Sequence, residues 1–483
     1  MVHAMPWIAA RSRRCGSGSG VSLCATVVQH QRFRGDFSAI SQAFARLIGE
    51  ASQVNVAGIS LMHGWLTVAS QVASAVLLLA GIRFRVRPIV MGAAAGVSVS
   101  LLAYWLLLQR QLMPGSAPVT FWIWLSLAVF AVIMAVTGWW RAPWWRRATN
   151  IAALGTICLC VALAANQWAG FYPTAGRAWD ALTAQPLANQ AALGSLTTLR
   201  GTTESDGKLV VIDSRDDLSH FHHRREYVYL PPAWFRGPTP PALPAVVMIG
   251  GVVTTPEDWI RSGEAIDHVQ QYANAHHGYG PILVFVDPTG SLTNDTECVD
   301  GSHGNVDTHI TEEIRPEVIS AFNASSDAAR WAVAGWSMGG TCAIDLTVEH
   351  PEQFHTFVDI SGDIGPNLGN RSQTTDSLYR GRPDQWARFD PTIAMRTHGP
   401  YTDVSGLVES EGHRTCHSRC GSSQIAAATT LSAMAQKYNI LTTNHFRPGR
   451  HSWQFAATAF DHALPWLMAR LTDRRAAGTA VSR

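Results

Sequence analysis

The stretch Gly335-Trp336-Ser337-Met338-Gly339 decides the fold of this chain. It follows the apolar run WAVAG at 331–335, which predicts a β-strand, and it precedes GTCAIDLTVEH at 340–350, which predicts a helix. Glycines on both sides allow a turn so sharp that a side chain there would collide with neighbouring backbone. Such a strand–turn–helix unit holds a serine oxygen above the sheet, where a histidine can reach it. The stretch therefore predicts that Ser337 is a nucleophile.

Strands alternate with helices around this turn. The predicted strands are 227–234, 244–251, 281–288, 331–335 and 354–362. The predicted helices between them are 256–277, 308–322 and 340–350. Continuous apolar strands separated by helices are typical of a parallel sheet covered on both faces. We therefore predict an α/β domain at 226–474.

A serine nucleophile needs a base, and on this type of sheet the chain order is serine, acid, histidine. His451, in the phrase RPGRHSWQF, lies between a predicted strand at 438–446 and a predicted helix at 459–471. A loop between the last strand and the last helix is where the base belongs, so His451 is the predicted base. The alternatives are His445 and His462, which fall within the predicted strand and near the start of the predicted helix.

The acid of the triad should follow the preceding strand, which we place in DVSGLVESEGH at 403–413. Glu409 and Glu411 both qualify. Glu411 is favoured because it lies beyond the expected strand end, whereas Glu409 still belongs to the strand. The acid would orient the imidazole and stabilise the imidazolium.

Two backbone amides should stabilise the oxyanion. One belongs to Met338, the residue after the serine, and the second to a loop after an early strand. Gly251 and Val252 follow such a strand, and the glycines let the backbone approach a substrate closely. An ordinary glycine turn is the alternative interpretation of this segment.

The first third of the chain is unusually apolar. Charged residues make up 15% of the sequence, against about 25% in soluble proteins, and the deficit lies mainly in this third. Four segments free of charge have the length needed to cross a bilayer: 61–82, 88–108, 119–140 and 149–168. Tryptophans cluster at their ends, as in an interfacial aromatic belt. A four-helix transmembrane region is therefore predicted at 59–169.

Arginines in the short loops predict the orientation. The first loop holds Arg83, Arg85 and Arg87, the third holds Arg141, Arg146 and Arg147, and the second holds Arg110 alone. The positive-inside rule places the first and third loops in the cytoplasm. The α/β domain would then lie on the extracytoplasmic side of a multi-pass cell-membrane protein.

The remaining parts of the chain have weaker patterns. Residues 1–58 are basic and lack apolar periodicity, so we expect a disordered leader, or translation that begins at Met62. A connector at 170–225 and a tail at 475–483 complete the predicted organisation.

Four of the eight cysteines fall outside the leader and the apolar segments. An extracytoplasmic compartment permits disulfides. Cys298–Cys342 would tie a loop to the helix after Ser337, and Cys416–Cys420 would close a short loop. Both pairings are hypotheses.

Two short runs have the composition of metal sites. EGHRTCHSRC at 411–420 and HFHH at 220–223 contain ligand residue types at close spacing. The candidate ligands in the first run are His413, Cys416, His417 and Cys420. A disulfide loop is the better interpretation of that run, and we predict neither a metal nor a cofactor.

These residues together resemble the esterase family of α/β-hydrolases, which includes S-formylglutathione hydrolases and the mycobacterial antigen 85 mycolyltransferases. The matching phrases are YVYLPP, GWSMGGTCA followed by HPEQF and DISGD, and the terminal HSWQF. The resemblance covers about residues 225–470. It implies an α/β-hydrolase fold with Ser337 as nucleophile, Met338 as oxyanion donor and His451 as base. It does not fix the acid, because LVESEGH departs from the family pattern.

The front end is also similar to that of actinobacterial membrane-anchored esterases. The expected function is a membrane-anchored extracytoplasmic serine esterase that acts through an acyl-enzyme on an ester, lipid or glycolipid. The alternatives are an acyltransferase to a cell-envelope sugar and a non-catalytic hydrolase-like binding domain. The formal net charge of +2 gives no indication of a nucleic-acid partner.

Overall fold

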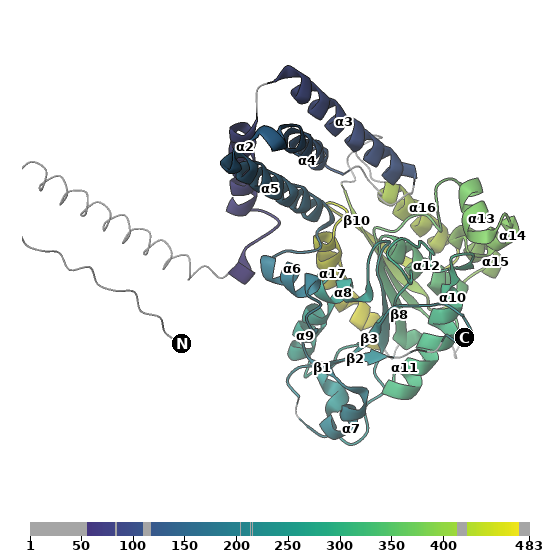
Figure 1. Cartoon of the computed structure of the whole chain (residues 1–483). Coiled ribbons are helices and arrows are strands. Elements are labelled where there is room, and N and C mark those ends of the chain that lie inside the picture. The colour runs from purple at the N-terminus through teal and green to yellow at the C-terminus, as the bar shows by residue number, and fades with distance from the viewer. Residues whose placement is uncertain are drawn as a thin grey trace, which may run out of the picture. The chain divides into compact units, whose positions relative to one another are not determined.

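The computed structural model describes residues 56–82, 85–109, 117–202, 204–212, 214, 216–412 and 423–472. Four apolar helices come first along the chain, and an α/β domain built on a nine-stranded sheet follows them (Figure 1). Contacts join both parts, from Ala57 onward, into one unit.

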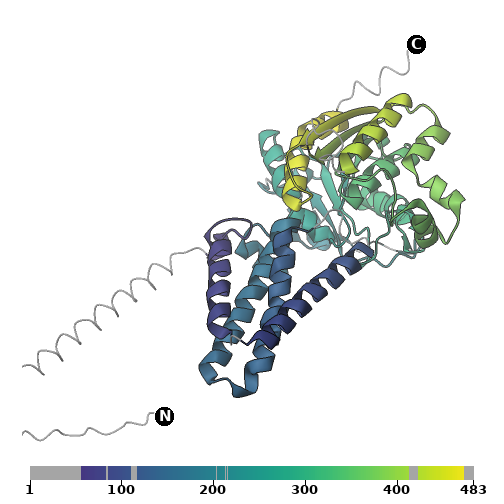
Figure 2. The same cartoon turned by 90° about the horizontal axis from the view of Figure 1, so that it is seen from above.

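The apolar helices are α2 (Trp65–Gly81), α3 (Val86–Gln109), α4 (Val119–Gly138) and α5 (Trp144–Ala169). Helix α5 packs against α2 and α4, and α4 packs against α3 (Figure 2). Helices α3, α4 and α5 are long and apolar enough to cross a membrane, whereas α2 has only 17 residues. Three of the four predicted spans are therefore supported, and the span at 61–82 is not confirmed.

Helix α2 begins at Trp65 and not at residue 61, because the residues before it pair with another segment of the chain. The amide of Leu61 bonds to the carbonyl of Pro173, and the amide of Ala175 bonds to the carbonyl of Ile59. Gly64, with φ of 111°, then turns the chain before Trp65. Residues 61–64 thus connect this pairing to α2 instead of extending the helix.

The central sheet has the order β1-β2-β3-β5-β4-β8-β9-β10-β11. Its strands are β1 (Gln190–Ala191), β2 (Lys208–Ile212), β3 (Glu226–Leu230), β4 (Ala245–Ile249), β5 (Ile282–Phe285), β8 (Trp331–Trp336), β9 (Thr356–Ile360), β10 (Ser405–Glu411) and β11 (Leu441–Arg447). Strand β3 runs antiparallel to β2 and β5, and every other neighbouring pair is parallel. The predicted mostly parallel sheet is confirmed. A short hairpin, β6 (Asp300–Gly301) with β7 (Gly304–Asn305), lies outside it.

Helices cover both faces of the sheet. One face carries α10 (Val306–Thr308), η5 (His309–Ile314), α11 (Arg315–Phe322), α12 (Met338–Glu349), α15 (Pro391–His398) and α16 (Ser423–Lys437). The other carries α8 (Pro256–Arg261), α9 (Ala265–Ala275) and α17 (Trp453–Thr472). Successive strand residues point to opposite faces, so Val247 joins the first core and Met248 the second. This two-sided burial explains the continuous apolar strands.

Smaller helices complete the described chain. They are η1 (Val56–Gly58), η2 (Trp139–Arg141), α6 (Ala175–Leu182), η3 (Leu193–Ser195), α7 (Leu196–Leu199), η4 (Pro232–Phe235), η6 (Ala328–Arg330), α13 (Arg371–Tyr379) and α14 (Pro383–Arg388).

The predicted helix at 256–277 is interrupted. Helix α8 ends where the amides of Ser262 and Gly263 both bond to the carbonyl of Asp258. Gly263 lies so close to Trp259 that a β-carbon there would be 2.6 Å from the indole. Glu264 then adopts φ of 51°, and α9 starts in a new direction. The sequence pattern that predicted one helix over 256–277 could not reveal this local turn.

Candidate active site

The turn between β8 and α12 carries Ser337 at φ 61° and ψ −124°. Its glycines are required by close backbone contacts. A β-carbon on Gly335 would lie 1.9 Å from the carbonyl oxygen of Gly339, and one on Gly339 would lie 2.2 Å from the carbonyl oxygen of Ile249. A non-glycine residue at positive φ is uncommon and persists only where its surroundings enforce it. The turn thus has the sharp geometry that the sequence predicted.

Three side chains form a hydrogen-bonded chain at this turn. Nε2 of His451 lies 2.9 Å from Oγ of Ser337, and Nδ1 lies 3.0 Å from Oε1 of Glu411. His451 comes from the loop between β11 and α17, and its ring packs 5.0 Å from the ring of Trp336. Both nitrogens of the imidazole are therefore engaged, which fixes its orientation.

Glu411 is the last residue of β10, where it pairs in register with Arg447 of β11. The expectation that it lies beyond the strand end is wrong, because this pairing extends the strand to it. Its second carboxylate oxygen accepts a hydrogen bond from Ser361. Burial opposes ionisation, but the hydrogen bonds and charge of His451 and the bond from Ser361 outweigh it and lower the pKa of Glu411.

Glu409 lies two residues earlier on the same strand, about 7 Å further from its end. Its carboxylate binds Nδ1 of His445 at 2.8 Å and Nε of Arg447 at 3.0 Å. His462, in α17, contacts the guanidinium of Arg447. The alternative acid and both alternative bases are therefore gathered around Arg447, apart from Ser337.

The predicted oxyanion donors also lie near the serine. A β-carbon on Gly251 would be 3.1 Å from Cβ of Ser337 and 3.5 Å from its Oγ. Met338 is the first residue of α12, and Val252 lines the same cavity as Ser337. The role of the three amides as oxyanion donors stays a prediction.

An ion pair between the partly exposed Arg224 and the buried Asp287 supports the loop that carries Gly251. Arg224 donates to Asp287 through Nη2 at 2.5 Å and Nε at 2.9 Å, and to the carbonyl of Thr254 at 2.9 Å. Thr254 in turn donates to the carbonyl of Gly251 at 2.7 Å. Asp287 has no exposed surface; burial alone would raise its pKa, but Arg224 lowers it below the ordinary value.

This ion pair gives a pH-dependent stability prediction. Replacing Arg224→Met should lower the thermal midpoint at pH 7 by about 6–12 °C, because Asp287 becomes a buried, uncompensated charge. In the native protein, the lowered pKa of Asp287 adds stability above the unfolded value of about 3.9, and this is lost as pH falls below it. In the variant, burial without Arg224 raises the pKa of Asp287, so this group is protonated more readily at pH 5 than at pH 7. The difference in thermal midpoint between the native protein and the variant should therefore be smaller at pH 5.

Thermal melts of the full chain in detergent at both pH values measure this effect. The exposed neighbour Arg225→Met is the matched control and should stay within about 2 °C of the native midpoint. A difference in thermal midpoint between the native protein and Arg224→Met that is equal at pH 7 and pH 5 would contradict the account.

A cavity of about 800 Å³ opens at Ser337 and His451. One part of its wall is apolar and includes Leu107 of α3, Trp168 of α5 and Phe171. Hydrogen bonds hold this wall to the domain: Gln454 donates to the carbonyl of Gly170 at 2.7 Å, and Ser262 to that of Phe171 at 2.6 Å. The site is thus bordered by the apolar helices as well as by the α/β domain.

Another part of the cavity wall is acidic, a feature that the sequence analysis missed. It includes Asp295, Glu297 and Asp363. Glu297 is 4% exposed, and its Oε2 has no hydrogen-bond partner among the residues that the structure describes. Burial and the neighbouring carboxylates raise the pKa of Asp295 to about 7 and that of Glu297 well above its ordinary value. Asp295 and Glu297 lie in the sequence DTECVDG at 295–301. This sequence has no pattern that would assign its carboxyl groups to the cavity.

The predicted disulfide between Cys298 and Cys342 is present and ties this acidic loop to α12. The other predicted pair, Cys416–Cys420, and the candidate zinc ligands His413 and His417 lie outside the described residues.

Removing both cysteines (Cys298→Ala with Cys342→Ala) should destabilise the domain by about 4 kcal/mol, because the bond closes a long loop in the unfolded chain. The sequence separation is 44 residues. The measurement is a thermal melt with and without reductant. The native midpoint should fall on reduction, while that of the double variant should fall much less; a reductant effect of equal size in both would contradict the prediction.

A mostly parallel sheet with a serine at a sharp strand–helix turn defines the α/β-hydrolase class of serine hydrolases. Residues 222–467, half of the chain, match the model of the family described as "Putative esterase", and the chain belongs to this family. It is also similar to an uncharacterized protein of Corynebacterium glutamicum, with 29% identity over 434 residues that cover 84% of this chain and 96% of that protein.

Two solved structures are similar to this chain at low identity. An S-formylglutathione hydrolase from Agrobacterium tumefaciens is 20% identical, with a TM-score of 0.45, and the match covers 56% of this chain and 98% of that one. A ferulic acid esterase is 16% identical, with a TM-score of 0.45, and the match covers 55% and 99%.

Proposed function

We propose that this protein is a membrane-anchored serine esterase whose triad is Ser337, His451 and Glu411. The observation that carries the proposal is the continuous hydrogen-bonded chain from the strained serine through both imidazole nitrogens to a buried carboxylate. In this arrangement, Oγ of Ser337 attacks an ester carbonyl while Nε2 of His451 accepts its proton. Glu411 stabilises the imidazolium, and its lowered pKa keeps it ionised for that purpose.

The remaining steps use the same residues. The negative charge on the former carbonyl oxygen would be held by the amides of Met338 and of Gly251 or Val252. His451 then gives its proton to the leaving alcohol, and an acyl group stays on Ser337. A water molecule deprotonated by His451 then attacks the acyl carbon. The bond from this carbon to Oγ of Ser337 breaks, His451 returns the proton to Oγ, and the carboxylic acid leaves.

The kinetic test of this proposal is a stopped-flow assay with p-nitrophenyl esters. We expect a burst of nitrophenol close to one equivalent per chain where deacylation is slower than acylation. Absence of ester cleavage by a protein with a cooperative thermal transition would favour the alternative, a hydrolase-like binding domain.

Surface apolarity supports the membrane anchor. Large aliphatic side chains on all four helices stay uncovered by protein: Val68, Leu101, Ile123 and Ile151 are each more than half exposed. Such a surface is stable in contact with lipid and would associate in water. We propose four spans, with a short α2, and a division into leader 1–58, membrane region 59–169, connector 170–225, esterase domain 226–474 and tail 475–483.

The arginine distribution supports an extracytoplasmic esterase domain in a multi-pass protein. Protease added to intact spheroplasts tests this placement. We expect digestion of the domain in intact spheroplasts, whereas a cytoplasmic domain would be digested only after lysis.

The apolar cavity wall supports a lipid or glycolipid ester as substrate. Leu107 and Trp168 would contact an acyl chain that extends from the carbonyl at Ser337 toward the membrane helices. Activity on p-nitrophenyl esters should then rise with acyl length; a preference for acetate over long chains would contradict this substrate class.

The acidic wall favours acyl transfer as a second candidate function. Carboxyl groups of Asp295, Glu297 and Asp363 could bind the hydroxyl groups of a sugar acceptor beside the acyl-enzyme. A cell-envelope sugar would then replace water. Product analysis in the presence of sugars distinguishes the two: a sugar ester would support transfer, and free acid alone would support hydrolysis.

A further inference from the structure

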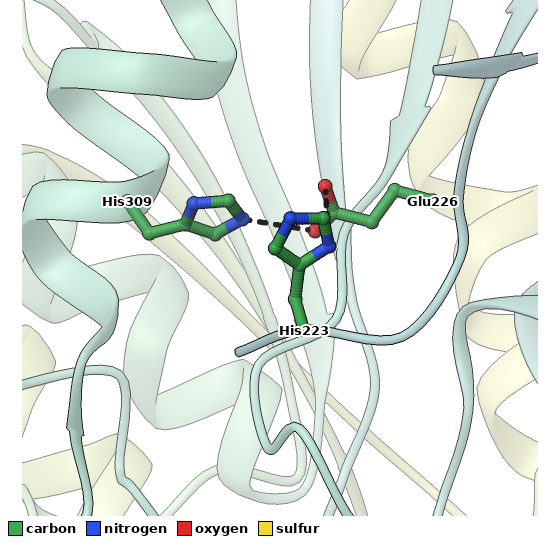
Figure 3. Close-up of side chains that lie close together, drawn as sticks. All are labelled: His223, Glu226 and His309. Atoms are coloured by element: carbon green, nitrogen blue, oxygen red, sulfur yellow. Dashed lines mark hydrogen bonds and ion pairs between the residues drawn. The ribbon is translucent and has the colours of Figure 1, made fainter. Parts of the chain in front are cut away.

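Two clusters of described residues bring imidazole and carboxylate atoms within 4.8 Å of one another, as a metal site requires. One comprises His223, Glu226 and His309 (Figure 3), and the other comprises Asp307, Glu349 and His350. Neither includes a residue of the proposed triad. The clusters differ in whether their polar atoms already have partners.

The first cluster is satisfied without an ion. Figure 3 shows the carboxylate of Glu226 facing both histidines, and its Oε1 lies 3.2 Å from Nε2 of His309. The other nitrogen of His309 lies 2.7 Å from Glu313, and Ser214 donates to Glu226 at 2.7 Å. The rings of His223 and His309 are stacked 4.7 Å apart, so their in-plane lone pairs do not converge. Protons on His309 suffice to hold this cluster together.

The second cluster contains buried oxygens without partners. Asp307 is 3% exposed and accepts from Nε2 of His350 at 2.7 Å. Oε1 of Glu349 is buried and has no hydrogen-bond partner in the part of the chain that the structure describes. One helical turn earlier on α12, Asp345 is 4% exposed, and both of its carboxylate oxygens lack described partners. Buried polar groups without partners are rare and point to a missing ion or water.

The charge of this cluster is only partly compensated. His350 contacts Asp307 at 2.7 Å and the exposed Glu352 at 3.4 Å, but neither contact gives a partner to Oε1 of Glu349 or to Asp345. Of the charged groups around Asp345, Glu349 repels its carboxylate most strongly. Arg388 approaches Asp307 only to 3.9 Å and is 57% exposed, so solvent screens it. Glu349 also lies at the end of α12, where the helix dipole disfavours a further negative charge. A cation at this point would relieve all three effects.

We propose that Asp307, Glu349 and His350 bind one divalent metal ion, with Asp345 beside it. Two carboxylate oxygens and one imidazole nitrogen suit Zn²⁺ or Mn²⁺. Binding would release to solvent the proton that lies between Nε2 of His350 and Asp307. The ion would join α10 to the far end of α12, about 18 Å along that helix from Ser337. It would therefore stabilise the helix that follows the serine and would take no part in ester cleavage.

The test uses the full chain in detergent, purified without a metal-binding tag. Elemental analysis should find about one equivalent of metal per chain. After chelation, about 1 mM Zn²⁺ or Mn²⁺ should raise the thermal midpoint by about 5–10 °C. Glu349→Gln should lose both the metal and this shift, whereas the exposed Glu312→Gln should keep them.

Two results would overturn the proposal. One is a native chain that contains no metal and whose midpoint neither ion moves, which would mean that the buried carboxyls are protonated. The other is an undiminished shift in Glu349→Gln, which would mean that the ion binds elsewhere. If Glu349→Gln does not fold, Asp307→Asn is measured in the same way.

Discussion

Ser337→Ala should lower kcat for ester hydrolysis by about 10⁵-fold or more, since loss of a triad serine removes the covalent pathway entirely. The residual rate would come from the oxyanion donors and from substrate binding alone. The hydroxyl is 2.9 Å from Nε2 of His451, and Ser337 lines the cavity, so its loss removes the nucleophile from this position. The KM should change little, because the serine oxygen contributes mainly to the transition state.

The measurement is a steady-state assay of the native chain and the variant in the same detergent, with matched thermal midpoints. Ser320→Ala, an exposed serine on α11, is the control and should retain full activity. A Ser337→Ala protein with a tenth or more of native kcat would mean that the nucleophile lies elsewhere.

Glu411→Gln should lower kcat by about 10³–10⁴-fold, whereas Glu409→Gln should leave it within about threefold. An amide at position 411 can donate a hydrogen bond to Nδ1 of His451, which would favour the wrong tautomer, and it cannot stabilise the imidazolium. Glu409 instead contacts His445 and Arg447, so its loss should affect stability and not the triad.

This pair of variants is matched, because the two residues share a strand, a residue type and a charge. Assaying kcat per folded molecule separates the effect on catalysis from the effect on folding. The reverse order of effects would assign the acid to Glu409, and equal small effects would mean that Ser337 and His451 act without either carboxylate.

The turn at Ser337 and the strand pattern could be predicted because both depend on neighbouring residues. The glycines of GWSMG specify one sharp turn, and continuous apolar runs specify strands buried on both faces. Chain order and a Pro/Gly loop were enough to select His451, which the structure brings into contact with Ser337. Its catalytic role stays a prediction.

The acid of the triad could not be chosen from the residues around it in the sequence. Glu409 and Glu411 are two residues apart and point to the same side of β10, so alternation does not distinguish them. The pairing of Glu411 with Arg447 and the hydrogen bond from Ser361 place Glu411 at the strand end beside His451. Both partners are distant in sequence.

Other features depend on contacts across the chain in the same way. The acidic cavity wall joins Asp295 and Glu297 to Asp363, and the proposed metal site joins Asp307 to Glu349. Residues 59 and 61 pair with residues 175 and 173, so the helix of the first apolar segment does not begin until Trp65. Hydropathy and spacing within one segment carry no information about such partners.

Labelling of the full chain with a fluorophosphonate, followed by peptide mass mapping, tests the central claim most directly. A serine activated by the His451–Glu411 pair should form one adduct per chain, on the peptide that contains Ser337, and Glu411→Gln should label far more slowly. A folded native chain that does not react, or an adduct on another residue, would contradict the assignment of this site.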